Sequence, residues 1–75
     1  MIYETIRTII AEHLGIVESR ITMDTSISED LEIDSLDAVE IIMAIEDAFS
    51  IDVDEEALEQ FTTIREIVEY VEAHQ

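Results

Sequence analysis

Hydrophobic residues recur with helical spacing in three stretches of this chain, and one long stretch between the first two has no period. At about 100° per residue, the residues from 2 to 14 carry their large apolar side chains on one face. That face consists of Ile2, Ile6, Ile9, Ile10 and Leu14. Gly15 follows directly and can adopt the left-handed conformation that ends a helix. The pattern predicts a first helix over residues 2–14.

The second helical stretch, residues 35–49, has two apolar faces instead of one. The first consists of Ala38, Ile41, Ile42, Ile45 and Phe49, and the second of Leu36, Val39 and Met43. A small domain buries one face of a helix well, so the second face is expected to be exposed. It is surrounded by the carboxylates of Asp37, Glu40, Glu46 and Asp47.

Apolar side chains among these carboxylates favour a surface on which partner proteins dock. Glu46 and Asp47 strengthen this interpretation, because they lie near the helix C-terminus, where negative charge opposes the helix dipole. Local rules that are broken without a visible structural gain tend to mark function. The alternative is a solvated face that only keeps the protein in solution.

Two further helices are expected in the C-terminal third. Residues 55–61 predict a short helix with Ala57, Leu58 and Phe61 as its apolar positions. Thr63 and Glu66 have the spacing of a capping box. They open a last helix whose apolar face consists of Ile64, Ile67, Val68 and Val71.

Residues 16–34 show no sustained period, and such a long loop needs anchors in a compact domain. The expected anchors are Val17, Ile21, Met23, Ile27, Leu31 and Ile33. Residues 21–23 and 51–53 alternate like strands, but they are too short for a stable pair. The predicted fold class is all-α: one domain over residues 1–75, a small bundle of three main helices plus one short helix, with a long loop between helices one and two.

Composition narrows the possible partners. The 75 residues carry 20 carboxylates against three arginines, which gives a net charge of −17. Nucleic acid and anionic membranes are poor partners for such a chain, whereas basic protein surfaces and cations are natural ones. No apolar run is long enough to span a membrane, and no signal peptide is visible. The absence of cysteine excludes thiolate chemistry of the chain itself and fits a cytoplasmic protein. We also expect the protein to be monomeric.

Ser35 is the main candidate for chemistry. Its position before an apolar-periodic run is typical of a helix cap, a role that Asp34 could also fill, and from spacing alone this is the commoner explanation. The alternative is a hydroxyl that carries a covalent phosphodiester, favoured by the free amides of the helix N-terminus. Neither His13 nor His74 is placed beside it by the sequence, so a catalytic triad is not indicated and both are expected at the surface.

No metal site is predicted. The only glycine lacks the acidic flanks of an EF-hand loop. Loose divalent binding at Glu29 and Asp30, or at Asp52, Asp54 and Glu55, is explained equally well by ordinary surface acidity.

The motif Asp34-Ser35-Leu36 and its surroundings resemble the acyl carrier protein family. Asp30-Leu31 precedes the motif, and a segment from Asp37 to Glu46 follows it at the family's spacing. Phe49, the acidic stretch 52–56, Thr62-Thr63-Ile64 and the first helix continue the match. The resemblance covers essentially the whole chain and is closest to the discrete bacterial carriers of fatty-acid synthesis.

The resemblance implies that Ser35 is esterified with 4′-phosphopantetheine from coenzyme A, whose thiol holds acyl groups as thioesters. It implies that Asp34 helps a phosphopantetheinyl transferase to engage its cofactor, and that the carrier itself catalyses nothing. The partners would be this transferase and fatty-acid synthesis enzymes with basic patches. Their contacts would be Leu36, Asp37, Val39, Glu40, Met43, Glu46, Asp47 and Val53. The acyl chain would shelter near Ile45 and Phe49.

The chain departs from the family at three positions: Glu32 replaces a usual Gly, Asp54 a frequent Pro, and Gln60 a common Lys. Because Glu32 stands where glycine is usual, the sequence leaves the conformation of the turn before Ser35 open. Two alternatives stay open from the sequence. One is a discrete polyketide or aminoacyl carrier, and the other is an unmodified acidic interaction module.

Overall fold

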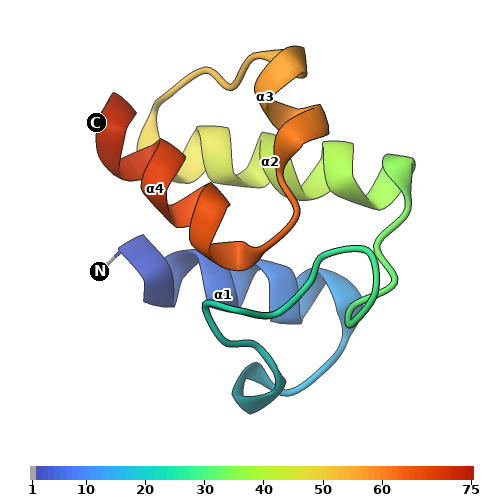
Figure 1. Ribbon diagram of the computed structural model, residues 1–75. Coiled ribbons are helices and arrows are strands. Elements are labelled where there is room, and N and C mark those ends of the chain that lie inside the picture. Colours follow the sequence, from blue (N-terminus) through green and yellow to red (C-terminus); the bar gives the residue numbers. More distant parts are fainter. Residues whose placement is uncertain (1) are drawn as a thin grey trace.

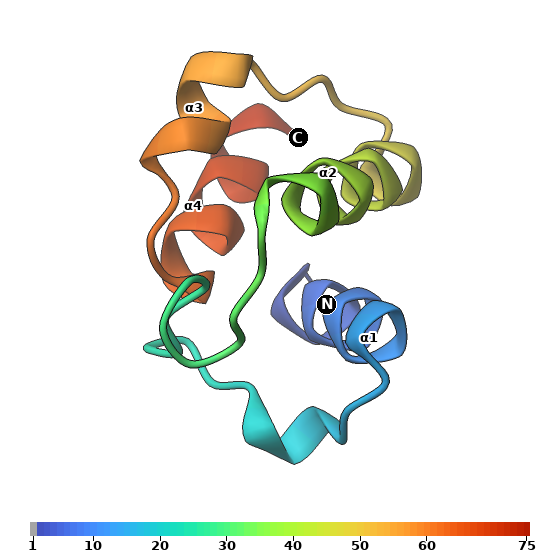
Figure 2. The same cartoon turned by 90° about the vertical axis from the view of Figure 1, so that its right-hand side faces the viewer.

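Three long helices, one short helix and a 3-10 turn make up the computed structural model, which describes residues 2–75 (Figure 1). The helices are α1 (Ile2–Leu14), α2 (Ser35–Phe49), α3 (Glu55–Gln60) and α4 (Ile64–His74). Helix α1 packs against both α2 and α4. The first two helices run in opposite directions, as the end-on view in Figure 2 also shows. The all-α class, the four helices and the long loop between α1 and α2 are therefore as predicted.

Short-range features explain where the helices begin and end. Gly15 has φ 69° and ends α1, because only glycine adopts that conformation without a steric cost. Asp34 caps α2 by accepting a hydrogen bond from the Asp37 amide at 2.8 Å. Ser50 ends α2 with φ 55°. The Thr63–Glu66 capping box opens α4, as its spacing predicts.

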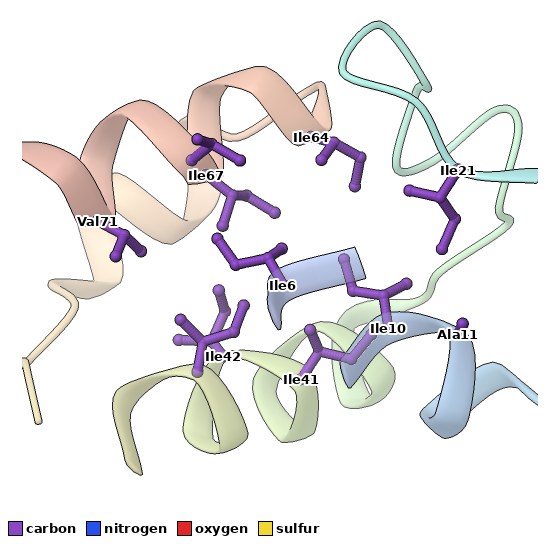
Figure 3. Packing of buried hydrophobic residues seen from close by; sticks show 11 residues of the cluster. Ile6, Ile10, Ala11, Ile21, Ile41, Ile42, Ile64, Ile67 and Val71 are labelled. Carbon is purple, nitrogen blue, oxygen red and sulfur yellow. The ribbon is translucent and has the colours of Figure 1, made fainter. Parts of the chain in front are cut away.

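The core lies where the predicted apolar faces of α1, α2 and α4 meet. Figure 3 shows Ile6 and Ile10 of α1 pointing toward side chains of α2 and α4. Four isoleucines have no exposed surface: Ile6, Ile10, Ile45 and Ile64. Burying a side chain of this size contributes roughly 1.5–3 kcal/mol each. The buried residues of α2 and α4, with Ile6 and Ile10 of α1, are thus ones that helical spacing predicts, whereas buried Ala11 lies outside the predicted face.

Hydrogen bonds fasten the long loop to the start of α4. The Ile64 amide donates to the carbonyl of Thr25 at 3.2 Å, and the Arg65 amide donates to that of Met23 at 2.9 Å. These bonds use amides that the first turn of a helix leaves free. Ile21 is buried, and Met23, Ile27, Leu31 and Ile33 pack against the core as expected.

One predicted loop anchor is wrong. Val17 is 62% exposed, and it immediately precedes the 3-10 turn Glu18–Arg20, which the periodicity did not predict. The two segments that alternate like strands form no strand within residues 2–75. The only bridge described there joins Ser26 to Thr63.

The turn before α2 holds Glu32 in a left-handed conformation with φ 53°. This conformation costs an L-residue about 1 kcal/mol more than glycine. We therefore expect Glu32→Gly to raise the free energy of unfolding by about 1 kcal/mol, measured by denaturant titration. Glu32→Ala is the matched control, since it removes the same charge but keeps the Cβ. An equal gain in both variants would mean that charge, not backbone strain, limits stability here.

The capping box makes the free energy of unfolding depend on pH. Hydrogen bonds from the Thr62 hydroxyl and from the Thr62 and Thr63 amides lower the pKa of Glu66. A lowered folded-state pKa means that the stabilisation is present above the unfolded pKa and is lost as the pH falls through the folded one. We expect the melting temperature of Glu66→Ala to differ most from wild type near neutral pH. The difference should shrink in acid, and a constant difference across the pH range would contradict this origin.

Candidate functional site

Ser35 is the first residue of α2, and its hydroxyl is free. The residue is exposed, and no hydrogen bond of its hydroxyl occurs among residues 2–75. The cap position belongs to Asp34, whose carboxylate binds the Asp37 amide. The cap interpretation of Ser35, favoured by spacing alone, is therefore wrong. Because Asp34 satisfies the helix end, the Ser35 hydroxyl can take another role.

The second apolar face of α2 is exposed, as predicted. Leu36 is 68% exposed, Met43 57% and Val39 44%, which is unusual for large apolar side chains on a well-packed helix. Asp47 is exposed at the C-terminal end of the same helix, and Glu40 near its middle. We call these five residues, with Asp37, Glu46 and Val53, the docking face.

Glu46 also has a structural role that the sequence did not reveal. Its Oε2 accepts a hydrogen bond of 2.8 Å from the Val53 amide, so it holds the segment between α2 and α3. The unfavourable charge near the helix end therefore does bring a structural gain, contrary to the argument from sequence. The bond also places Val53 beside Val39 and Met43 in one groove of about 280 Å³ between α2 and α3.

His13 is exposed, as expected, and it also faces the first turns of α2. Its Nε2 lies 3.3 Å from Asp37 Oδ1 and 3.3 Å from Glu40 Oε2. The side chain of His13 is 26% exposed. Two docking-face carboxylates are thus in contact with the last turn of α1.

A small apolar cavity, partly open to solvent, lies between the helices on the inner side of α2. It measures about 60 Å³, and its walls come from all four helices and the long loop. Its lining residues are Ile10, Ile27, Ile33, Ala38, Ile41, Ile42, Leu58, Phe61 and Ile67. Ile33, which lines the cavity, lies only two residues before Ser35 in the sequence. The residues predicted for the acyl pocket are not among them: Ile45 is fully buried in the core, and Phe49 is half-buried at the other end of α2.

Comparison with known proteins decides the family. The family model for the phosphopantetheine attachment site matches residues 4–71. An acyl carrier protein of Rubrobacter xylanophilus is 47% identical over 74 residues, covering 99% of this chain and 91% of the relative. An acyl carrier protein of Guillardia theta is 43% identical over 70 residues, covering 93% and 86%.

The chain belongs to the acyl carrier protein family. It is an acyl carrier whose prosthetic group is 4′-phosphopantetheine, as the resemblance implied. The comparisons do not favour an unmodified interaction module. The exposed, unbonded hydroxyl of Ser35 fits an acyl carrier protein, because a phosphodiester placed there would meet the positive end of α2 and no side chain that must first be displaced.

The structure does not assemble the three-carboxylate cation site considered from the sequence. Among the residues described, Asp52, Asp54 and Glu55 do not bring their ligand atoms together, whereas His13, Asp37 and Glu40 do. The contribution of His13 could not be found from sequence, because it lies 24 residues from Asp37 and on another helix. No helix in residues 2–75 is both long and apolar enough to cross a membrane.

Proposed function

We propose that Ser35 is the attachment residue and that this carrier delivers acyl groups to fatty-acid synthesis enzymes. The observation that supports the attachment most strongly is the division of labour at the start of α2. Asp34 accepts the amide hydrogen bond, and the neighbouring hydroxyl is left exposed and without a partner in the described chain. Asp34 would also help the transferase to engage its cofactor.

The chain's own residues supply position and protection, and not catalysis. When attached, phosphopantetheine supplies the thiol that this cysteine-free chain lacks, so that an acyl group can be held as a thioester. Ser35 fixes the arm at a rigid helix end. In this proposal the chain performs no chemical step itself, acts as a monomer and works in the cytoplasm.

The docking face is proposed to bind the transferase and the basic patches of synthesis enzymes. Leu36, Val39, Met43 and Val53 would supply apolar contact, and the surrounding carboxylates the attraction at a distance. A carrier must visit several enzymes and leave each one. Electrostatic attraction raises association rates without a large interface that would release slowly.

The acyl chain is proposed to enter the bundle through the 60 Å³ cavity under α2. Since an apolar cavity of about 150 Å³ holds one benzene molecule, this space holds only a few methylene groups. A longer chain therefore requires the helices to part, and Ile45 and Phe49 would be reached only then. Their place in the acyl pocket stays a prediction.

A mass measurement tests the central claim. The purified chain is incubated with coenzyme A and a phosphopantetheinyl transferase, and a gain of one phosphopantetheine is expected. The loaded protein is then offered separately to fatty-acid and polyketide enzymes. Turnover by the first group alone supports the proposed pathway. Turnover by polyketide enzymes alone would favour the alternative carrier role, and no gain in mass would overturn the attachment.

A further inference from the structure

Three potential metal ligands from two helices meet in this structure, and two of them belong to the docking face. His13 comes from the last turn of α1, and Asp37 and Glu40 come from the first turns of α2. Their ligand atoms all lie within 4.8 Å of one another. This is the only such group of three or more in the part of the chain that the structure describes.

One directed hydrogen bond does not account for both contacts of His13. His13 Nε2 is equally far, 3.3 Å, from Asp37 Oδ1 and from Glu40 Oε2. One ring nitrogen carries at most one hydrogen, so it cannot donate well to both oxygens. Charge-assisted N–H···O bonds are also shorter, at about 2.7–2.9 Å.

The two distances from His13 suit a shared cation. In a tetrahedral zinc site with bonds of about 2.0–2.2 Å, neighbouring ligand atoms lie about 3.4 Å apart. Both His13 distances are close to this value. The carboxylates are also not paired with an arginine: Arg7 pairs with Glu18, and Arg65 with Asp24.

We propose that His13 Nε2 and one oxygen each of Asp37 and Glu40 bind a divalent transition-metal cation of the zinc class. Water would complete the coordination, since the three side chains keep 26%, 36% and 53% of their exposure. The imidazole selects against Mg²⁺ and Ca²⁺, which prefer oxygen ligands only. The net charge of −17 raises the local concentration of any cation.

Occupancy would have two consequences. It would join the end of α1 to the start of α2 two residues after Ser35, and it would neutralise two carboxylates of the docking face. The second consequence rests on the proposed function, whereas cation binding itself does not. Bound Zn²⁺ is therefore expected to slow loading by the transferase severalfold.

Calorimetric titration with Zn²⁺ near neutral pH tests the site. Wild type is expected to bind one Zn²⁺ that excess Mg²⁺ does not displace. His13→Gln should weaken that binding about tenfold or more, since even the loss of a group that only hydrogen-bonds to a metal ligand costs this much. His74→Gln is the matched control, because it removes the only other histidine, and it should bind as wild type does.

Nitrogen-15 shifts of the histidine rings supply a second readout that does not depend on activity. Zn²⁺ is expected to shift the Nε2 resonance of His13 and not that of His74. Equal binding by His13→Gln, displacement by Mg²⁺, or loss in His74→Gln would each overturn the site. Slowed loading without the Nε2 shift would also overturn it. Binding that leaves the loading rate unchanged would keep the site and remove only its link to docking.

Discussion

Replacing Ser35 by alanine is expected to abolish the gain of phosphopantetheine completely while leaving the fold intact. The hydroxyl is the proposed point of attachment, and alanine offers no oxygen. The fold should tolerate the change because Asp34, not Ser35, caps α2. An exposed position without a hydrogen bond changes the free energy of unfolding by about 0.5 kcal/mol or less. Intact-protein mass spectrometry and a thermal melt measure the two outcomes.

Ser19→Ala is the matched control for this experiment. Ser19 is also exposed, but it lies in the 3-10 turn Glu18–Arg20, away from the start of α2. It should load as wild type does. Loading that persists in Ser35→Ala would show that another side chain carries the group. Unfolding of Ser35→Ala would show that the residue stabilises the helix end, contrary to the geometry.

Reversing two charges of the docking face is expected to slow productive association by on the order of tenfold to a hundredfold. The proposed variant is Glu40→Lys with Asp47→Lys. Both residues are exposed on α2, so their replacement should turn attraction to a basic enzyme surface into local repulsion. The measurement is the concentration dependence of transferase loading and of turnover by a fatty-acid synthesis enzyme.

The control must change the net charge by the same amount elsewhere. Glu69→Lys with Glu72→Lys does so on the exposed side of α4. It should reduce association much less, because exposed charges farther than about 10 Å from an interface are screened in 0.1 M salt. Rising salt should also slow wild type more than the docking-face variant. An equal loss of association rate in both variants would mean that the net charge of the protein, and not the docking face, controls association.

One departure from the family pattern, Glu32, has a structural explanation. Glu32 occupies a left-handed backbone position, which explains physically why glycine is usual there. The residue is accommodated at a cost in stability, and the helix that follows still begins at Ser35.

Glu46 and His13 show the limit of reasoning from spacing. Helical periodicity placed Glu46 correctly on the exposed face, but its bond to the Val53 amide depends on how the α2–α3 segment folds back. His13 could be assigned to the end of α1, yet its contacts with Asp37 and Glu40 depend on how α1 packs on α2. Neither contact follows from the position of a residue within its own helix.

The amino-acid sequence by itself determined the helices, their buried faces, the exposed stripe on α2 and the candidate serine. These follow from local rules, because helical spacing, caps and glycine conformation involve residues only a few positions apart. Tertiary structure alone decided the position of the apolar cavity and the meeting of His13 with α2. These depend on contacts between distant segments, which are set by the packing of whole helices and not by the spacing within any one of them.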